Sequence, residues 1–408
     1  MSAARQDVCV TGRGAVCALG DQPQTILDAL CEGQRRFAPP TLFAADIAPG
    51  VDVAEVRDFV PQNYLKTGNI RPLDRTGRLA LVGVELALAD SGWSPEVRAA
   101  RALGLILGTM FCSVKTIAEF DRRALEAGPE YASPMDFSNT VLNAAAGQAA
   151  IWEKLRGVNT TIATGATSGL YAIGYGAQLI QRGRADALVT GGAEEVCYES
   201  FYGFLKAGRL ASANGRAATL APFDAGRNGT LMGEGAAFLV LETATSAQSR
   251  NAPVLARVLG VGSAYDPHTH DPNATDAGAL ASAIRSALAS AGIPGGEIGL
   301  VAASASGSRV LDAREAAGIH AVLGGDVPVT AIKSMTGEAL GASGALQTLF
   351  AIESLKAGRV PGIVGLLERD PEIPLNIAAH TRPLKATRAL VTSVSPEGNC
   401  CALIVAID

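Results

Sequence analysis

Few side chains in this sequence could do acid–base or metal chemistry. Its 408 residues include four histidines, His268, His270, His320 and His380. His268 and His270 stand two residues apart in a loop flanked by proline, a spacing that suggests a metal site, but no third ligand is evident. We therefore expect no metal site. His320 follows Glu315 on a predicted helix, where a surface or core position is expected.

The candidate nucleophiles are the hydroxyls of Thr167 and Ser168 and the thiol of Cys112. No Gly-x-Ser-x-Gly motif surrounds the two hydroxyls, so we expect them to bond to backbone groups where a helix begins. Cys112 follows an apolar strand without a recognisable basic partner, which favours an inert buried thiol. Lys333 would act as a base only if desolvated, and pairing with Glu338 would keep it charged.

The composition indicates a globular protein and excludes several classes. Apolar residues make up 48% of the chain and charged residues 18%, unlike a disordered tail. The net charge of −5 argues against a nucleic-acid partner. No apolar run reaches about 18 residues, and the first residues lack the core of a signal peptide, so we expect a cytoplasmic protein without a membrane segment. The seven cysteines form no Cys-x-x-Cys pair, which favours reduced, mostly buried thiols.

Two glycine pairs could in principle approach a phosphate group. Gly12 and Gly14, and later Gly191 and Gly192, are interpreted as turn glycines. Neither pair lies in a complete dinucleotide or phosphate-binding motif, so no nucleotide or other cofactor is expected.

The elements that must position these residues occur twice along the chain. In each half, apolar patterning predicts a strand, a helix that ends at glycine, two further strands, a glycine-rich turn and a second long helix. The first series comprises strand 7–12, helix 73–90, strand 103–107, strand 160–163 and a helix that ends near 184. The second comprises strand 254–261, helix 277–291, strand 298–302, strand 329–332 and a helix that ends near 359.

This order predicts an internal duplication of the α/β class. Alternating strands and helices favour parallel sheets joined by right-handed crossovers. We place the two halves at residues 1–250 and 251–408. No low-complexity linker separates them, so they are expected to share an interface.

Four segments resemble motifs of the β-ketoacyl-acyl carrier protein synthases and stay in register through most of the chain. They are the opening strand and loop at 7–20, the stretch from Ser133 to Gly157, the Pro-Phe-Asp…Gly-Glu-Gly-Ala segment at 221–236 and the Lys-Ser…Thr-Gly…Gly-Ala segment at 332–345. The resemblance implies the thiolase fold, a dimer whose duplicated βαβ halves stack in a five-layer α-β-α-β-α arrangement.

Enzymes of this family use a cysteine nucleophile and two histidines, and all three positions differ here. When the motifs are aligned, Ala166 occupies the position of the family's cysteine, Ser304 that of the first histidine and Glu338 that of the second. Lys333 is retained, whereas the late glycine-rich loop is altered at 395–400. Because a methyl group cannot form a thioester, the resemblance implies a subunit without catalytic residues or independent condensing activity.

Among such proteins the chain resembles a chain length factor, the ketosynthase β subunit of a type II polyketide synthase. The resemblance implies a heterodimer with a ketosynthase α subunit, which works on chains carried by an acyl carrier protein. Chain length factors of aromatic systems usually carry glutamine where this chain has Ala166. The sequence therefore leaves undecided whether the products are polyenes or aromatic compounds.

The resemblance also assigns two segments of the N-terminal half. The expected dimer strand consists of Thr160, Thr161, Ile162 and Ala163. The residues expected to line the partner's acyl cavity are Met110, Phe111, Val114 and Ala118. Ordinary core packing is the alternative role for the cavity-lining set.

Two other functions stay open from the sequence. One is an acyltransferase with atypical active-site residues, which a covalent acyl-enzyme would reveal. The other is a homodimer without catalytic activity that binds acyl chains or the carrier protein, which a stable, ligand-binding homodimer would favour.

Overall fold

The computed structural model describes residues 6–65, 68–211, 220–268 and 277–408. In these ranges one mixed sheet has eleven strands in the order β10-β8-β7-β12-β13-β6-β1-β5-β4-β2-β3, and β9 pairs separately with β11. The strands are β1 Val8–Cys17, β2 Gly104–Gly108, β3 Asn159–Ile162, β4 Ala187–Glu194, β5 Gly235–Thr243, β6 Ala256–Tyr265, β7 Leu300–Ala302, β8 Pro328–Thr330, β9 Arg359–Val360, β10 Asn376–Ile377, β11 Arg382–Pro383, β12 Arg388–Val394 and β13 Asn399–Ala406.

The predicted glycine stops end three of the long helices. Gly92, Gly292 and Gly358 follow α2, α10 and α13 in the left-handed conformation that a helix end favours and glycine tolerates. The α-helices are α1 Pro23–Cys31, α2 Arg75–Ser91, α3 Pro95–Ala100, α4 Val114–Ala127, α5 Pro134–Phe137, α6 Ala144–Trp152, α7 Ser168–Gln181, α8 Tyr198–Lys206, α9 Ala244–Ser249, α10 Gly278–Ala291, α11 Arg309–Leu323, α12 Lys333–Thr336 and α13 Ser343–Ala357.

The sheet contains the internal duplication that the sequence predicts. The order β3-β2-β4-β5-β1 in the N-terminal half corresponds to β8-β7-β12-β13-β6 in the C-terminal half. In each set the first three strands are parallel, and the last two run antiparallel to their neighbours. The two sets join where β1 pairs with β6.

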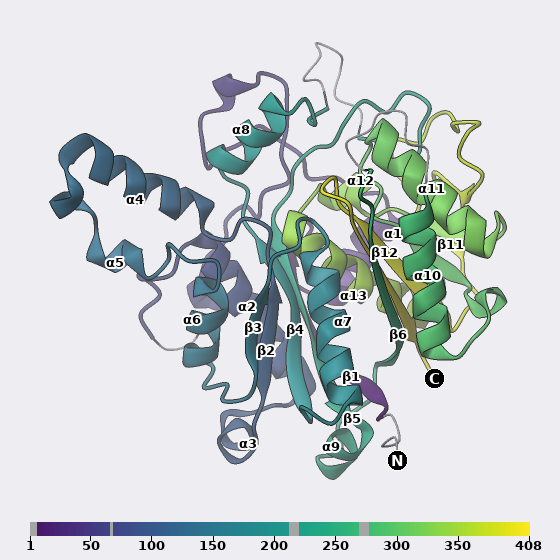
Figure 1. Cartoon of the computed structure of the whole chain (residues 1–408), viewed down its shortest axis with the longest axis horizontal. Helices are drawn as coiled ribbons and strands as arrows, with labels where there is room; N and C mark the ends of the chain where they lie inside the picture. Colours follow the sequence, from purple (N-terminus) through teal and green to yellow (C-terminus); the bar gives the residue numbers. More distant parts are fainter. Residues whose placement is uncertain (1–5, 66–67, 212–219, 269–276) are drawn as a thin grey trace.

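The expectation of wholly parallel sheets is therefore wrong. The connection from β4 to β5 carries α8 beyond the end of the sheet and not across its face, so the chain re-enters the sheet in the opposite direction (Figure 1). In the second half a tight turn at 395–398 joins β12 directly to the antiparallel β13.

Helices and sheet alternate in five layers, as the resemblance implies. Figure 1 shows α2 and α6 on one outer face and α10 and α11 on the other, with α7 and α13 between the two halves of the sheet. The contacts agree, since α7 packs on β2 and β4 and α13 packs on β5 and β12. The chain therefore has the α/β thiolase-like fold.

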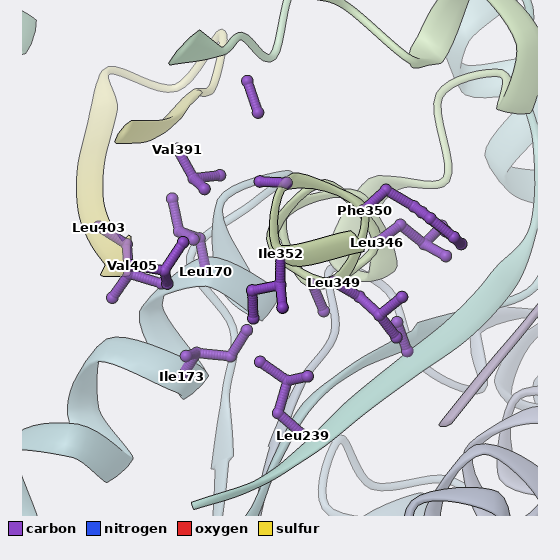
Figure 2. Close-up of a cluster of buried hydrophobic side chains, with 14 of the residues drawn as sticks. Leu170, Ile173, Leu239, Leu346, Leu349, Phe350, Ile352, Val391, Leu403 and Val405 are labelled. Atoms are coloured by element: carbon purple, nitrogen blue, oxygen red, sulfur yellow. The ribbon is translucent and has the colours of Figure 1, made fainter. Parts of the chain in front are cut away.

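The central layer holds the largest hydrophobic core. Side chains of α7 and α13 meet those of the flanking strands there, and Figure 2 shows Leu170, Ile173, Leu346 and Phe350 in this cluster. Hydrophobic burial of this kind is the main favourable term in folding. The two central helices are thereby fixed relative to each other.

The interpretation of the glycine pairs as turn residues is wrong. Gly12 and Gly14 lie in β1, and Gly191 and Gly192 lie in β4. A Cβ added to Gly12 would lie 2.4 Å from the Cβ of Ser91 on α2, and one on Gly191 would lie 2.0 Å from a carbonyl oxygen of β5. These glycines are required because neighbouring backbone approaches too closely for a side chain.

Two expectations about the chain as a whole concern membranes and thiols. None of the helices in the described ranges has both the length and the apolar character needed to span a bilayer. All seven cysteines are free thiols, and six of them are buried, which confirms the prediction of reduced, mostly buried cysteines.

The central core gives a testable stability difference. Phe350 is 1% exposed, so Phe350→Ala should lower the free energy of unfolding by about 3–5 kcal/mol through lost burial and a new cavity. Chemical denaturation measures this change. The control Leu367→Ala removes a side chain that is 90% exposed and should change stability by less than about 0.5 kcal/mol. Equal effects would contradict the assignment of the central layer as the core.

Candidate functional site

The turn before α7 is the position at which the family carries its nucleophile. Gly165 has a φ of +70°, which bends the chain sharply between β3 and α7. The Ser168 hydroxyl donates to the Gly165 carbonyl at 2.6 Å and accepts from the Thr164 amide at 2.9 Å, and the Thr167 hydroxyl donates to the Thr164 carbonyl at 2.6 Å. Both hydroxyls therefore bond to backbone groups of the turn, as expected. Ala166 presents only a methyl group.

The first turns of α7 and α13 approach each other closely, and this contact positions the turn. A Cβ added to Gly169 in the first turn of α7 would lie 2.4 Å from the Gly341 carbonyl oxygen. One added to Gly344 in the first turn of α13 would lie 2.7 Å from the Cβ of Leu170. The segment before α13, which carries Glu338, is thus held against the turn before α7.

A cavity of about 610 Å³ opens beside the turn and receives residues from both halves of the chain. Ala166, Ser304 and Glu338 all line it, so the structure brings together the three residues that the resemblance aligns with the family's catalytic positions. Other lining residues include Met110, Phe204, Arg209, Thr230, Arg309, Leu311, Glu315, Leu340 and Pro396.

Ser304 is already bonded within the protein. Its hydroxyl donates to Glu315 Oε1 at 2.9 Å and accepts from the Val394 amide at 3.1 Å. The same Glu315 oxygen accepts the Thr392 hydroxyl at 2.6 Å. Burial raises the pKa of Glu315, although these hydrogen bonds oppose the shift. Ser304 therefore ties β12 to α11, and no imidazole or other titratable base stands in its place.

Lys333 and Glu338 form a buried ion pair, as predicted. The Nζ of Lys333 lies 2.6 Å from Glu338 Oε2, and both side chains are almost fully buried. Glu338 Oε1 accepts from the Leu340 amide at 3.0 Å and the Ser343 hydroxyl at 2.8 Å. Both carboxylate oxygens of Glu338 are thus engaged by donors of the protein.

The loop between β12 and β13 adds two features that the sequence reasoning missed. Pro396 lines the cavity beside Ala166, and proline has no N–H group to donate to an oxyanion. Glu397 lies against the turn, because a Cβ added to Gly165 would fall 2.5 Å from its Oε2. Glu397 also approaches Arg209 at 3.6 Å. Only the mismatch of the loop with the family pattern signalled a change here.

The candidate groups at this cavity are bonded within the protein or buried. The turn has no thiol, the serine and the ion pair are internally bonded, and the adjoining loop lacks a backbone donor at Pro396. Cys112, the other thiol considered, is 1% exposed, and burial raises its pKa to about 12.

The residues expected to line a partner's cavity do not share one environment. Met110 lines the cavity of its own chain. Phe111 packs against the aromatic cluster that contains Phe201. Val114 and Ala118 lie on α4 and are half-exposed.

The expected dimer strand lies at an edge. β3 is the last strand in the sheet order and pairs with β2. Thr160, Thr161 and Ile162 are half-buried there, and Ala163 just beyond is exposed. On the same side of the molecule α4 and α5 project from the body (Figure 1), and α4 has no buried residue. Large apolar side chains exposed on or near this arm are Leu125, Tyr131, Met135, Phe137, Val141, Leu142 and Ile151.

The histidine pattern gives no metal geometry. His268 is exposed, and His270 lies outside the described residues. His320 is exposed on α11, with Nδ1 3.1 Å from the Pro374 carbonyl oxygen. Within the described ranges no three His, Cys, Asp or Glu side chains gather closely enough to hold a metal ion.

Solved structures with the same fold include ketosynthases and their partner subunits. The ishigamide ketosynthase/chain length factor matches with a TM-score of 0.92 and 30% identity over 99% of this chain and 100% of that chain. A complex of the ketosynthase ApeO with its chain length factor ApeC from Xenorhabdus doucetiae, at 22% identity, shares the fold with a TM-score of 0.83 over 99% of this chain and 98% of that chain.

Sequence comparisons identify the family. Residues 5–247 match the model of the β-ketoacyl synthase N-terminal domain, and residues 255–366 match that of the C-terminal domain. The 3-oxoacyl-[acyl-carrier-protein] synthase 2 of Coxiella burnetii is 30% identical over 98% of each chain. These two matches and this relative show that the chain belongs to the β-ketoacyl synthase family.

Proposed function

We propose that this chain is a non-catalytic chain length factor that pairs with an active ketosynthase and shapes the cavity in which the acyl chain grows. The observation that carries the proposal is Ala166 in the nucleophile turn. A β-ketoacyl synthase must take the acyl chain from its carrier protein as a thioester, and a methyl group cannot do so. The internal bonding of Ser304 and Glu338 supports the same conclusion.

The free edge and projecting arm support a macromolecular partner. β3 presents unpaired backbone groups at the sheet edge, which another strand can extend. Seven large apolar side chains on and near α4 and α5 are exposed in the isolated chain. The likeness to a ketosynthase/chain length factor structure, at 30% identity, favours a ketosynthase α subunit as the occupant.

The proposed mechanism is steric and non-covalent. The partner supplies the thiolate and the imidazoles, and the carrier protein delivers the chain to the partner. This chain contributes wall residues from the segment at 109–118, so their size limits how far the product extends. The cavity beside Ala166 has no part in bond formation.

That cavity is the observation that favours a second candidate function. With a volume of about 610 Å³ and a partly apolar lining, it has room for an acyl chain or a pantetheine arm. A homodimer that binds such ligands without reaction would use it. An acyltransferase with atypical residues would instead have to form a covalent adduct, which intact mass detects.

Co-expression with a ketosynthase α subunit that retains its nucleophile tests the proposal. Purification through a tag on one subunit should give a one-to-one heterodimer by native mass, with condensation only when both chains are present. A Cys→Ala change in the nucleophile turn of the ketosynthase should abolish condensation without preventing assembly, because that subunit supplies the thiolate. A homodimer that ignores the ketosynthase, or an acyl adduct on this chain, would contradict the proposal.

A second experiment tests whether the segment at 109–118 forms a wall of the acyl cavity. Phe111→Ala should lengthen the product of the heterodimer by at least one two-carbon unit, because a smaller side chain deepens the cavity; mass spectrometry of the products measures this. Phe43→Ala is the matched control, since Phe43 packs on Phe201 in the same aromatic cluster but lies outside the segment at 109–118. Unchanged length across single and combined substitutions at Met110, Phe111 and Val114 would rule out this wall.

A further inference from the structure

The carboxylate of Glu194 is surrounded by hydrogen-bond donors from one short segment. Glu194 is the last residue of β4 and is 1% exposed. Its Oε1 accepts the Phe111 amide at 3.0 Å and the Cys112 amide at 2.9 Å, and its Oε2 accepts the Met110 amide at 2.5 Å. The Thr109 hydroxyl also donates to Oε1, at 3.0 Å. Every residue from 109 to 112 thus donates to this one side chain.

The segment needs such a clamp to hold its shape. It links the end of β2 to α4 and lies in no helix or strand. Cys112 has a φ of +49°, a left-handed conformation that is unfavourable for a residue with a side chain and persists only where its surroundings impose it. Three consecutive amides converging on a carboxylate form a concave anion-binding arrangement. Without the carboxylate the Met110 and Phe111 amides would lose this acceptor, whereas the Cys112 amide would keep its bond to the Thr109 hydroxyl.

Glu194 also connects this segment to the cavity wall. Its Oε2 accepts the Gly341 amide at 3.2 Å, and a Cβ added to Gly341 would lie 2.5 Å from the Cα of Thr109. Leu340, next to Gly341, has a φ of +47° and donates its amide to Glu338. The position of residues 109–112 is therefore set against the turn that precedes α13.

Glu194 is held in place by hydrogen bonds. Among the described residues it has no ion-pair partner, whereas Glu242 pairs with Arg250 at 2.5 Å and Glu338 pairs with Lys333. Burial raises the pKa of Glu194 to about 7, and the amide and hydroxyl donors around its carboxylate oppose this shift. The geometry of those bonds is therefore the feature that Glu194 contributes to the fold.

We propose that Glu194 is the positioning residue that sets where Met110 and Phe111 stand and, through them, the length of the chain that the complex makes. The inference rests on the proposed function. Met110 faces the cavity of its own chain and Phe111 the aromatic cluster beside it. Because their successive amides bind opposite oxygens of one carboxylate, a change in that carboxylate shifts both side chains together.

The test uses the heterodimer with Glu194→Gln. Glutamine keeps the shape but turns one acceptor into a donor that faces backbone amides, so the segment must move. We expect the heterodimer to assemble and its products to change in length or spread over several lengths. Glu242→Gln is the control, because it alters a buried carboxylate of β5 bonded to Thr11, Trp93 and Arg250 and should leave product length unchanged.

A second variant covers the case in which Glu194→Gln does not assemble. The Thr109 hydroxyl donates to Glu194 and accepts from the Cys112 amide at 3.0 Å, so Thr109→Val removes both bonds with little change in volume. It should alter product length, and Thr109→Ser, which keeps the hydroxyl, should restore it. A purely structural role predicts lower stability with no change in length.

The outcomes separate this inference from the proposed function. If the wild-type pair assembles and Phe111→Ala changes product length, but assembled Glu194→Gln and Thr109→Val complexes give the wild-type length, the positioning role is wrong. If the wild-type chains do not assemble or make no product together, the proposed function fails first. Labelling of Cys112 by a thiol reagent then still reports on the clamp in the isolated chain, because a displaced segment exposes this buried thiol; unchanged labelling in Glu194→Gln would overturn it.

Discussion

The contact between the first turns of α7 and α13 is the constraint on which the rest of the structure depends. Both helices are buried between the two halves of the sheet, and glycines at 169 and 344 let their starts approach to backbone distance. Each helix is preceded by an irregular turn, one with Ala166 and the other with Glu338. Packing of the central layer thereby brings these two turns, one from each half of the chain, to the same cavity. A side chain at either glycine would separate the two walls.

Ser304 and Glu338 at that cavity bond within the protein, whereas Glu315 Oε2 has no hydrogen-bond partner among the described residues. Ser304 bonds to Glu315 and a backbone amide, and Glu338 bonds to Lys333 and the turn before α13. A buried polar group without a partner costs free energy, so these bonds stabilise Ser304 and Glu338 in the core.

The edge strand and the projecting arm differ from the cavity. Among the described residues β3 pairs with β2 alone, and large apolar side chains of the arm are exposed. The segment clamped by Glu194 leads from Met110 at the cavity directly into α4. One buried carboxylate thus links the interior to the face that we assign to a partner.

The sequence by itself determined six of the strands, the long helices between them, the duplication and the glycine stops of α2, α10 and α13, because these depend on local periodicity and residue type. It could not predict the antiparallel strands, or that Gly12 and Gly191 lie inside strands, because both depend on how closely distant backbone packs. The tertiary structure alone decided the roles of Pro396, Glu397 and Glu194. Each acts on a segment far away in the chain, and hydrogen bonds between distant segments leave no local pattern in a single sequence.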